Sequence, residues 1–203
     1  MNILFISLGC DKNLVDSEQM LGLLTQKGFT LTDDETQADV IVINTCCFIH
    51  DAKEESIQNI LEMAEYRKSG RCKALIVTGC LAQRYKQEII DEIEEVDAVI
   101  GTTAHDEIFE VIEKTLAGQK ELDIQDVDRL VEIDAKRVVT TGGHYAHLKI
   151  AEGCDKHCTY CIIPKIRGSY RSVPVERLLK EAQDLADQGV KELILVAPET
   201  TLY

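Results

Sequence analysis

The chain has 203 residues, of which 45% are hydrophobic, and it carries 22 Lys and Arg against 36 Asp and Glu, a net charge of −14. This length suits one large domain or one domain plus part of another, and the hydrophobic content is sufficient for a core. The acidity argues against broad binding of nucleic-acid backbones, and no apolar run approaches the roughly 18 residues that would span a bilayer.

The charge is unevenly distributed along the chain. Residues 88–134 contain 16 acidic and 3 basic side chains, whereas residues 149–171 contain 5 basic and 2 acidic ones. The acidic stretch has two interpretations, a solvated surface or a face that attracts a basic partner.

Eight cysteines are present, and the chain starts at Met1 without a basic, leader-like segment. We therefore expect a cytoplasmic protein, because cysteines in the reducing cytosol are more often metal ligands than disulfides.

The first half alternates short apolar runs with helical patterns. Strands are predicted at 3–8, 40–43, 74–77 and 98–101, and helices at 14–28, 52–68, 81–93 and 105–116. Strands and helices that alternate with short connections predict an α/β fold with a parallel sheet.

Cys10, Cys46 and Cys80 each follow the end of a predicted strand. Open parallel sheets gather their ligands at the carboxyl ends of the strands, so these thiols should converge on a metal centre with one open position. The alternative is three ordinary buried cysteines. Cys72 precedes a strand and Cys47 adjoins Cys46, so we leave both out of the site.

The second half is predicted to contain a linker and a new strand–helix unit. Residues 119–143 indicate a linker, with the possibility of a strand pair before it, and a strand at 144–151, a helix at 174–189 and a strand at 193–197 follow. Such units open a β/α barrel, which two strands cannot close. We therefore expect an N-terminal fragment that is inactive alone, divided into a domain at 1–118, the linker at 119–143 and an incomplete barrel at 144–203.

The loop after the strand at 144–151 contains Cys154, Cys158 and Cys161 with the spacing C-x3-C-x2-C. Three thiolates are one ligand short of a closed zinc site, whereas a four-iron cluster on three thiolates keeps one iron open. With His157 as fourth ligand, a zinc site is the alternative. Tyr160 stands directly before the third cysteine.

The pattern C-x3-C-x-aromatic-C resembles the signature of radical S-adenosylmethionine (SAM) enzymes, and residues 163–172 resemble their methylthiotransferase branch. Residues 7–18, 77–85 and 199–203 are similar to the members that modify ribosomal protein S12, whereas the members that modify tRNA usually have methionine where this chain has Lys12. Three positions depart from the family pattern: Asp11, Cys47 and Pro198.

The resemblance implies two [4Fe-4S] clusters. Cys154, Cys158 and Cys161 would hold the cluster that binds SAM, with Tyr160 at the adenine, and Cys10, Cys46 and Cys80 would hold the cluster that carries the sulfur. The implied reaction adds a methylthio group to the β-carbon of an aspartate of ribosomal protein S12, with a low-potential electron donor such as flavodoxin. No further catalytic residue is assigned.

Two alternatives remain from the sequence, the same chemistry on tRNA and a non-catalytic zinc-binding module. Lys165, Arg167 and Arg171 also have two interpretations: they neutralise the charge of the cluster or of SAM, or they form a solvated basic face.

Overall fold

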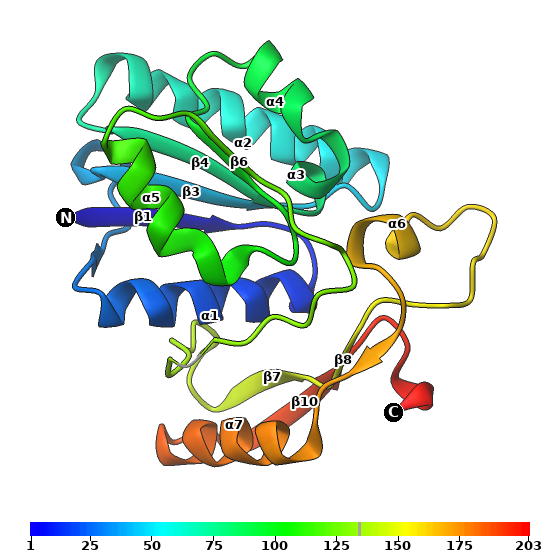
Figure 1. Ribbon diagram of the computed structural model, residues 1–203. Helices are drawn as coiled ribbons and strands as arrows, with labels where there is room; N and C mark the ends of the chain where they lie inside the picture. Colours follow the sequence, from blue (N-terminus) through cyan, green and yellow to red (C-terminus); the bar gives the residue numbers. More distant parts are fainter. Residues whose placement is uncertain (134) are drawn as a thin grey trace.

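In the computed structural model, which describes residues 1–133 and 135–203, a six-stranded parallel sheet forms the larger part and a smaller strand–helix unit lies beside it (Figure 1). The strand order is β2-β1-β3-β4-β5-β6. The strands are β1 (Asn2–Ser7), β2 (Thr30–Leu31), β3 (Val40–Thr45), β4 (Ala74–Gly79), β5 (Ala98–Ile100) and β6 (Glu121–Asp123). The α/β fold with a parallel sheet is thus confirmed.

Helices cover both faces of this sheet (Figure 1). On one face lie α1 (Asp11–Gln26) and α5 (Ile108–Leu116), and on the other lie α2 (His50–Ser69), α3 (Cys80–Tyr85) and α4 (Gln87–Glu92). Short 3₁₀ turns occur at Glu35–Gln37, His105–Glu107 and Thr200–Leu202.

The central strands β3 and β4 are buried at every residue, which explains why they appear in the sequence as continuous apolar runs. Successive side chains of a strand point to opposite faces. Val42 accordingly packs in the cluster that contains Met20 and Ile112, and Ile43 packs in the cluster that contains Ile60 and Leu81.

The smaller unit has a parallel strand pair connected through a helix. β7 (Tyr145–Lys149) pairs with β10 (Glu192–Val196), and α7 (Val175–Asp187) packs on β7. Its small cores include Leu148 with Leu178, and Ala146 with Leu185. Three short elements were not predicted: β8 (Ala151–Glu152), its antiparallel partner β9 (Arg171–Ser172) and the helix α6 (Ile163–Arg167) between them.

Two predictions about local structure need correction. The single helix predicted at 81–93 is two helices, because Lys86 adopts a positive φ of 49° between α3 and α4. Where a strand pair was considered before the linker, the described residues form one strand, β6, which pairs with β5 and extends the first sheet. No helix within residues 1–133 or 135–203 combines the length and apolar character needed to cross a membrane.

Candidate functional site

Cys10, Cys46 and Cys80 lie beyond the carboxyl ends of three neighbouring strands. Cys10 follows β1, Cys46 follows β3, and Cys80 begins α3 directly after β4. Because the strands pair in register, with Ser7 opposite Asn44 and Thr45 opposite Gly79, their ends align along one edge of the sheet. The topology therefore brings three cysteines from distant sequence positions to the same edge.

All three cysteines line one cavity of about 690 Å³. Its wall is completed by the smaller unit, which contributes Ile163, Ile166 and Arg167 from α6 and Ala197 and Pro198 from the segment after β10. Cys46 and Cys80 are buried, whereas Cys10 is exposed. Burial raises the pKa of the Cys80 thiol to about 12.

Glycines permit the close approach of the strand-end loops. Gly9 and Gly79 have φ angles of +91° and +90°, a region that side chains other than glycine rarely adopt. A Cβ atom at Gly9 would lie 2.6 Å from Cβ of Cys46, and one at Gly79 would lie 2.2 Å from Oδ1 of Asn44. The loops that carry the three thiols thus depend on two positions without a side chain.

The second cysteine set lies on an open loop between β8 and α6. Cys158 is exposed, and Cys154 and Cys161 are partly exposed. The backbone amide of Cys154 donates to the carbonyl of Gly168 (3.0 Å) and that of Cys161 to the carbonyl of Cys158 (2.9 Å). The first bond ties the start of the loop to the residue after α6, and the second forms a turn at the end of the loop.

Tyr160 projects from the same loop with 88% of its surface exposed. Its contact with adenine stays a prediction. The loop is also tied by an ion pair between Lys156 and Glu199, which follows β10. This ion pair holds the cysteine loop next to the segment that follows β10.

The two remaining cysteines lie apart from these sets. Cys72 is buried before β4, at the opposite edge of the sheet, and its thiol donates to the carbonyl of Ala74 (3.2 Å). Cys47 is buried in the core next to α2, and its thiol donates to the carbonyl of Cys80 (3.3 Å). Neither lines the cavity that Cys10, Cys46 and Cys80 share.

A buried group of charges between the two parts of the molecule was not predicted. It consists of the buried side chains of Asp16, Lys149 and Arg167 together with the half-buried Glu152. Arg167 contacts Asp16 at 2.9 Å and Glu152 at 2.8 Å, and Lys149 pairs with the same two carboxylates. Burial alone would raise the pKa of Asp16, but Lys149 and Arg167 hold it well below its usual value.

These charges correct one interpretation of the sequence. Arg167 is only 4% exposed, so a solvated basic face is wrong for this residue, although Lys165 is exposed. In the sequence Arg167 stands among other basic residues, and a charge pattern does not distinguish a buried cation from a surface one. Only the strand and helix contacts between distant segments reveal it.

The donor atoms of both sets are thiols, the ligands that iron–sulfur clusters require. Across residues 1–133 and 135–203, no group of three or more His, Cys, Asp or Glu side chains is placed to hold a metal ion. The first set nevertheless shares one cavity and the second lies on one accessible loop, and the thiol chemistry of both sets is that of cluster ligands.

Two family profiles match this chain. Residues 2–101 match uncharacterized protein family UPF0004, and residues 148–203 match the radical SAM superfamily. The first match contains Cys10, Cys46 and Cys80, and the second contains Cys154, Cys158 and Cys161.

The chain is also similar to curated proteins named ribosomal protein uS12 methylthiotransferase RimO. It is 70% identical over 203 residues to the protein of Lachnoclostridium phytofermentans, covering all of this chain and 46% of the relative. The protein of Acetivibrio thermocellus is 56% identical over 205 residues, with 98% of this chain and 45% of the relative covered. The protein of Thermoanaerobacter sp. is 50% identical over 202 residues, with 100% and 46% covered. The chain thus spans about half the length of the curated relatives it matches.

Proposed function

We propose that this chain belongs to the methylthiotransferase family of radical SAM enzymes and that the protein adds a methylthio group to the β-carbon of an aspartate of ribosomal protein S12. Relatives with this substrate in their names match the whole chain, the first of them at 70% identity. Because the chain spans about half of each relative, the activity is proposed for a protein with the relatives' full length.

We assign the two cysteine sets to two [4Fe-4S] clusters. Cys10, Cys46 and Cys80 would hold one in their shared cavity, and Cys154, Cys158 and Cys161 would hold the other on the loop. When bound, such clusters supply low-potential electrons and an open iron for SAM or for a sulfur donor. Tyr160 would place its ring against the adenine of SAM.

We retain the proposed division into a cluster domain at 1–118, a linker at 119–143 and the start of a barrel at 144–203. Within the segment proposed as the linker, Glu121–Asp123 form β6, which pairs with β5 at the edge of the first sheet.

One observation carries the proposal. Cys10, Cys46 and Cys80 are 34 residues or more apart, follow three adjacent strands and line one cavity. Residues of α6, the helix directly after the second cysteine loop, line the same cavity. Three unrelated cysteines would not be expected to share both a sheet edge and a cavity.

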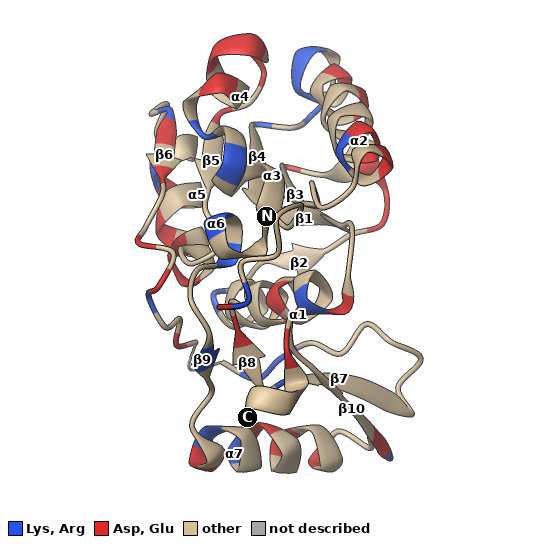
Figure 2. Ribbon diagram, turned by 90° about the vertical axis from the view of Figure 1, so that its right-hand side faces the viewer, with Lys and Arg blue, Asp and Glu red and all other residues tan. Residues whose placement is uncertain are grey.

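The distribution of charge supports the proposed protein substrate, but less strongly than the cysteine geometry supports the clusters. Figure 2 shows acidic residues gathered on α4 and basic residues on α6 and β9. A net charge of −14 suits a basic ribosomal protein better than tRNA. We also propose a low-potential electron donor such as flavodoxin and a cytoplasmic location, in keeping with eight free thiols.

The first test is anaerobic reconstitution of the chain with iron and sulfide. About eight irons per chain and absorbance near 400 nm are expected, and replacing Cys46 and Cys80 with alanine should reduce the iron to about four. Bound zinc without a visible chromophore would instead indicate a zinc module. A protein of the relatives' full length should then be offered S12 and tRNA separately, and a methylthio mass gain on tRNA alone would contradict the proposed substrate.

A further inference from the structure

We infer that Arg167 is a positioning residue for the centre formed by Cys10, Cys46 and Cys80, which it reaches through Asn13. This inference rests on the function proposed above, because it takes these cysteines as the ligands of a cluster. It assigns a role to two residues that do not themselves ligate iron.

Asn13 contacts all three strand-end segments. Its side chain is fully buried, and Nδ2 donates to the carbonyl of Leu8 (3.0 Å), before Cys10, and to the carbonyl of Thr45 (2.9 Å), before Cys46. The Cys80 thiol lies 3.6 Å from its Oδ1 atom. One amide therefore sets the relative positions of the three loops that carry the thiols.

Arg167 holds this amide in place from the other part of the molecule. Nη2 of Arg167 donates to Oδ1 of Asn13 (2.5 Å), which leaves Nδ2 directed at the two backbone carbonyls. Arg167 also lines the cysteine cavity itself. Its helix is in turn anchored, because the hydroxyl of Thr102 donates to the carbonyl of Ile166 (2.7 Å).

The same contact joins the two cysteine sets. Arg167 lies on α6, six residues after Cys161, so a hydrogen bond from Arg167 to Asn13 limits how far the second cysteine loop can move from the first set. The two proposed centres are thereby coupled through one buried side chain.

Arg167 also sets the charge beside the first centre. The two carboxylates Asp16 and Glu152 are balanced by Lys149 and Arg167. Loss of the Arg167 charge leaves one negative charge in excess next to the thiolates, and loss of the Asp16 charge leaves one positive charge in excess. Reduction of a cluster adds negative charge, so these changes should shift the potential in opposite directions.

The experiment isolates the first centre by replacing Cys154, Cys158 and Cys161 with alanine. These residues lie on an exposed or half-exposed loop, so the cores are left intact. The reconstituted chain is titrated with dithionite, and its midpoint potential is followed by electron paramagnetic resonance. We expect Arg167→Gln to disfavour reduction about tenfold, which is about 59 mV for one electron, and Asp16→Asn to favour it by a similar factor.

Two variants separate a specific effect of Arg167 on the centre from a general loss of stability. Arg167→Lys retains the charge and should restore the potential toward that of the parent. Arg137→Gln is the matched control, because Arg137 is also buried (5% exposed) and pairs with Glu18 (3.0 Å) and Glu181 (2.6 Å), yet does not line the cysteine cavity. It should lower stability and leave the potential unchanged.

Equal potentials in the parent, Arg167→Gln and Asp16→Asn would overturn the inference and leave the proposed function standing. If Arg167→Gln does not fold, the direction of the shift in Asp16→Asn decides alone, and an unchanged or lower potential rejects the inference. A parent chain that takes up no iron at Cys10, Cys46 and Cys80 would refute the proposed function, and the inference with it.

Discussion

The two cysteine sets are positioned by different means. Cys10, Cys46 and Cys80 owe their proximity to a sheet whose central strands are buried at every residue. Cys154, Cys158 and Cys161 lie within eight residues of one another, on the loop after β8. In the neighbouring two-stranded sheet of the same unit, β10 exposes Leu193, Ile194 and Leu195. The first set therefore depends on long-range folding, whereas local chain spacing is sufficient to bring the second set together.

The largest expected difference between the two regions is in stability. Ile76 is fully buried in β4, so Ile76→Ala should lower the free energy of unfolding by about 2–5 kcal/mol through lost burial and a cavity. Leu195, on β10, is 56% exposed, and Leu195→Ala should change the free energy by less than about 0.5 kcal/mol. Urea unfolding followed by circular dichroism measures both.

A similar loss in both variants would contradict this difference between the regions. It would mean that β10 is covered in solution by a contact that the described residues do not show. Ile76→Val is a milder control, with an expected loss of about 0.5–1.5 kcal/mol.

This contrast also explains what the sequence could predict. The apolar runs of β3 and β4 are recognisable because both faces of these strands are buried, and the cysteines directly after the strands could then be placed on one edge. The split between α3 and α4 was missed, because Lys86 carries no sequence signal for its positive φ. Asn13 and Arg167 were missed as a pair, because their contact joins residues 154 positions apart.

The second prediction concerns the reactivity of the thiols in the metal-free chain. Cys158 is exposed, whereas Cys46 and Cys80 are each 6% exposed. Alkylation of these two residues by iodoacetamide should be at least about a hundredfold slower than that of Cys158, because the sheet edge must first open, at a cost of about 2.7 kcal/mol. Peptide mass spectrometry after timed quenching gives the rate for each residue.

Two internal controls accompany this measurement. Cys10 belongs to the first set but is exposed, so it should react at a rate closer to that of Cys158. Cys72, buried at the opposite edge, should be protected like Cys80. In denaturant all these rates should converge, and rapid labelling of Cys80 in the native chain would show that the first set is not held by the sheet.

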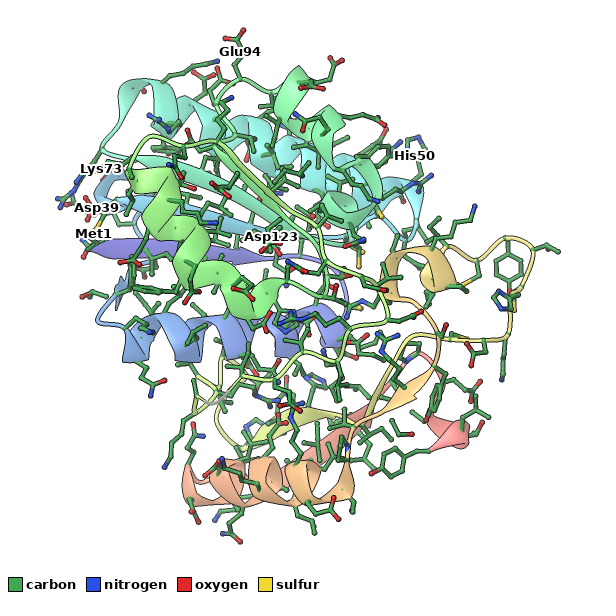
Figure 3. The ribbon with its side chains drawn as sticks, viewed as in Figure 1. Met1, Asp39, His50, Lys73, Glu94 and Asp123 are labelled. Carbon is green, nitrogen blue, oxygen red and sulfur yellow. The ribbon has the colours of Figure 1, made fainter. Side chains whose placement is uncertain are left out.

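The smallest expected effect on stability concerns Asp39, at the amino edge of the same sheet. Figure 3 shows Asp39 and Lys73 near Met1 and far from His50, which follows the Cys46 loop. The backbone amide of Asn2 donates to Asp39 (2.8 Å), and Arg71 and Lys73 pair with it. The amide bond, with the two cations, lowers the pKa of Asp39 from 3.8 to about 2.

Since the carboxylate is favoured in the folded chain, its contribution to stability should be complete above about pH 4 and lost as the pH falls through 2. Asp39→Asn should therefore cost about 2 kcal/mol at pH 7, and this difference from the parent should shrink steadily between pH 4 and pH 2. Asp33→Asn, at an exposed position nearby, is the control and should change stability by less than about 0.5 kcal/mol. A deficit in Asp39→Asn that stays constant down to pH 2 would indicate lost packing instead of lost charge, and the first sheet would then owe its stability at this edge, as at its centre, to burial.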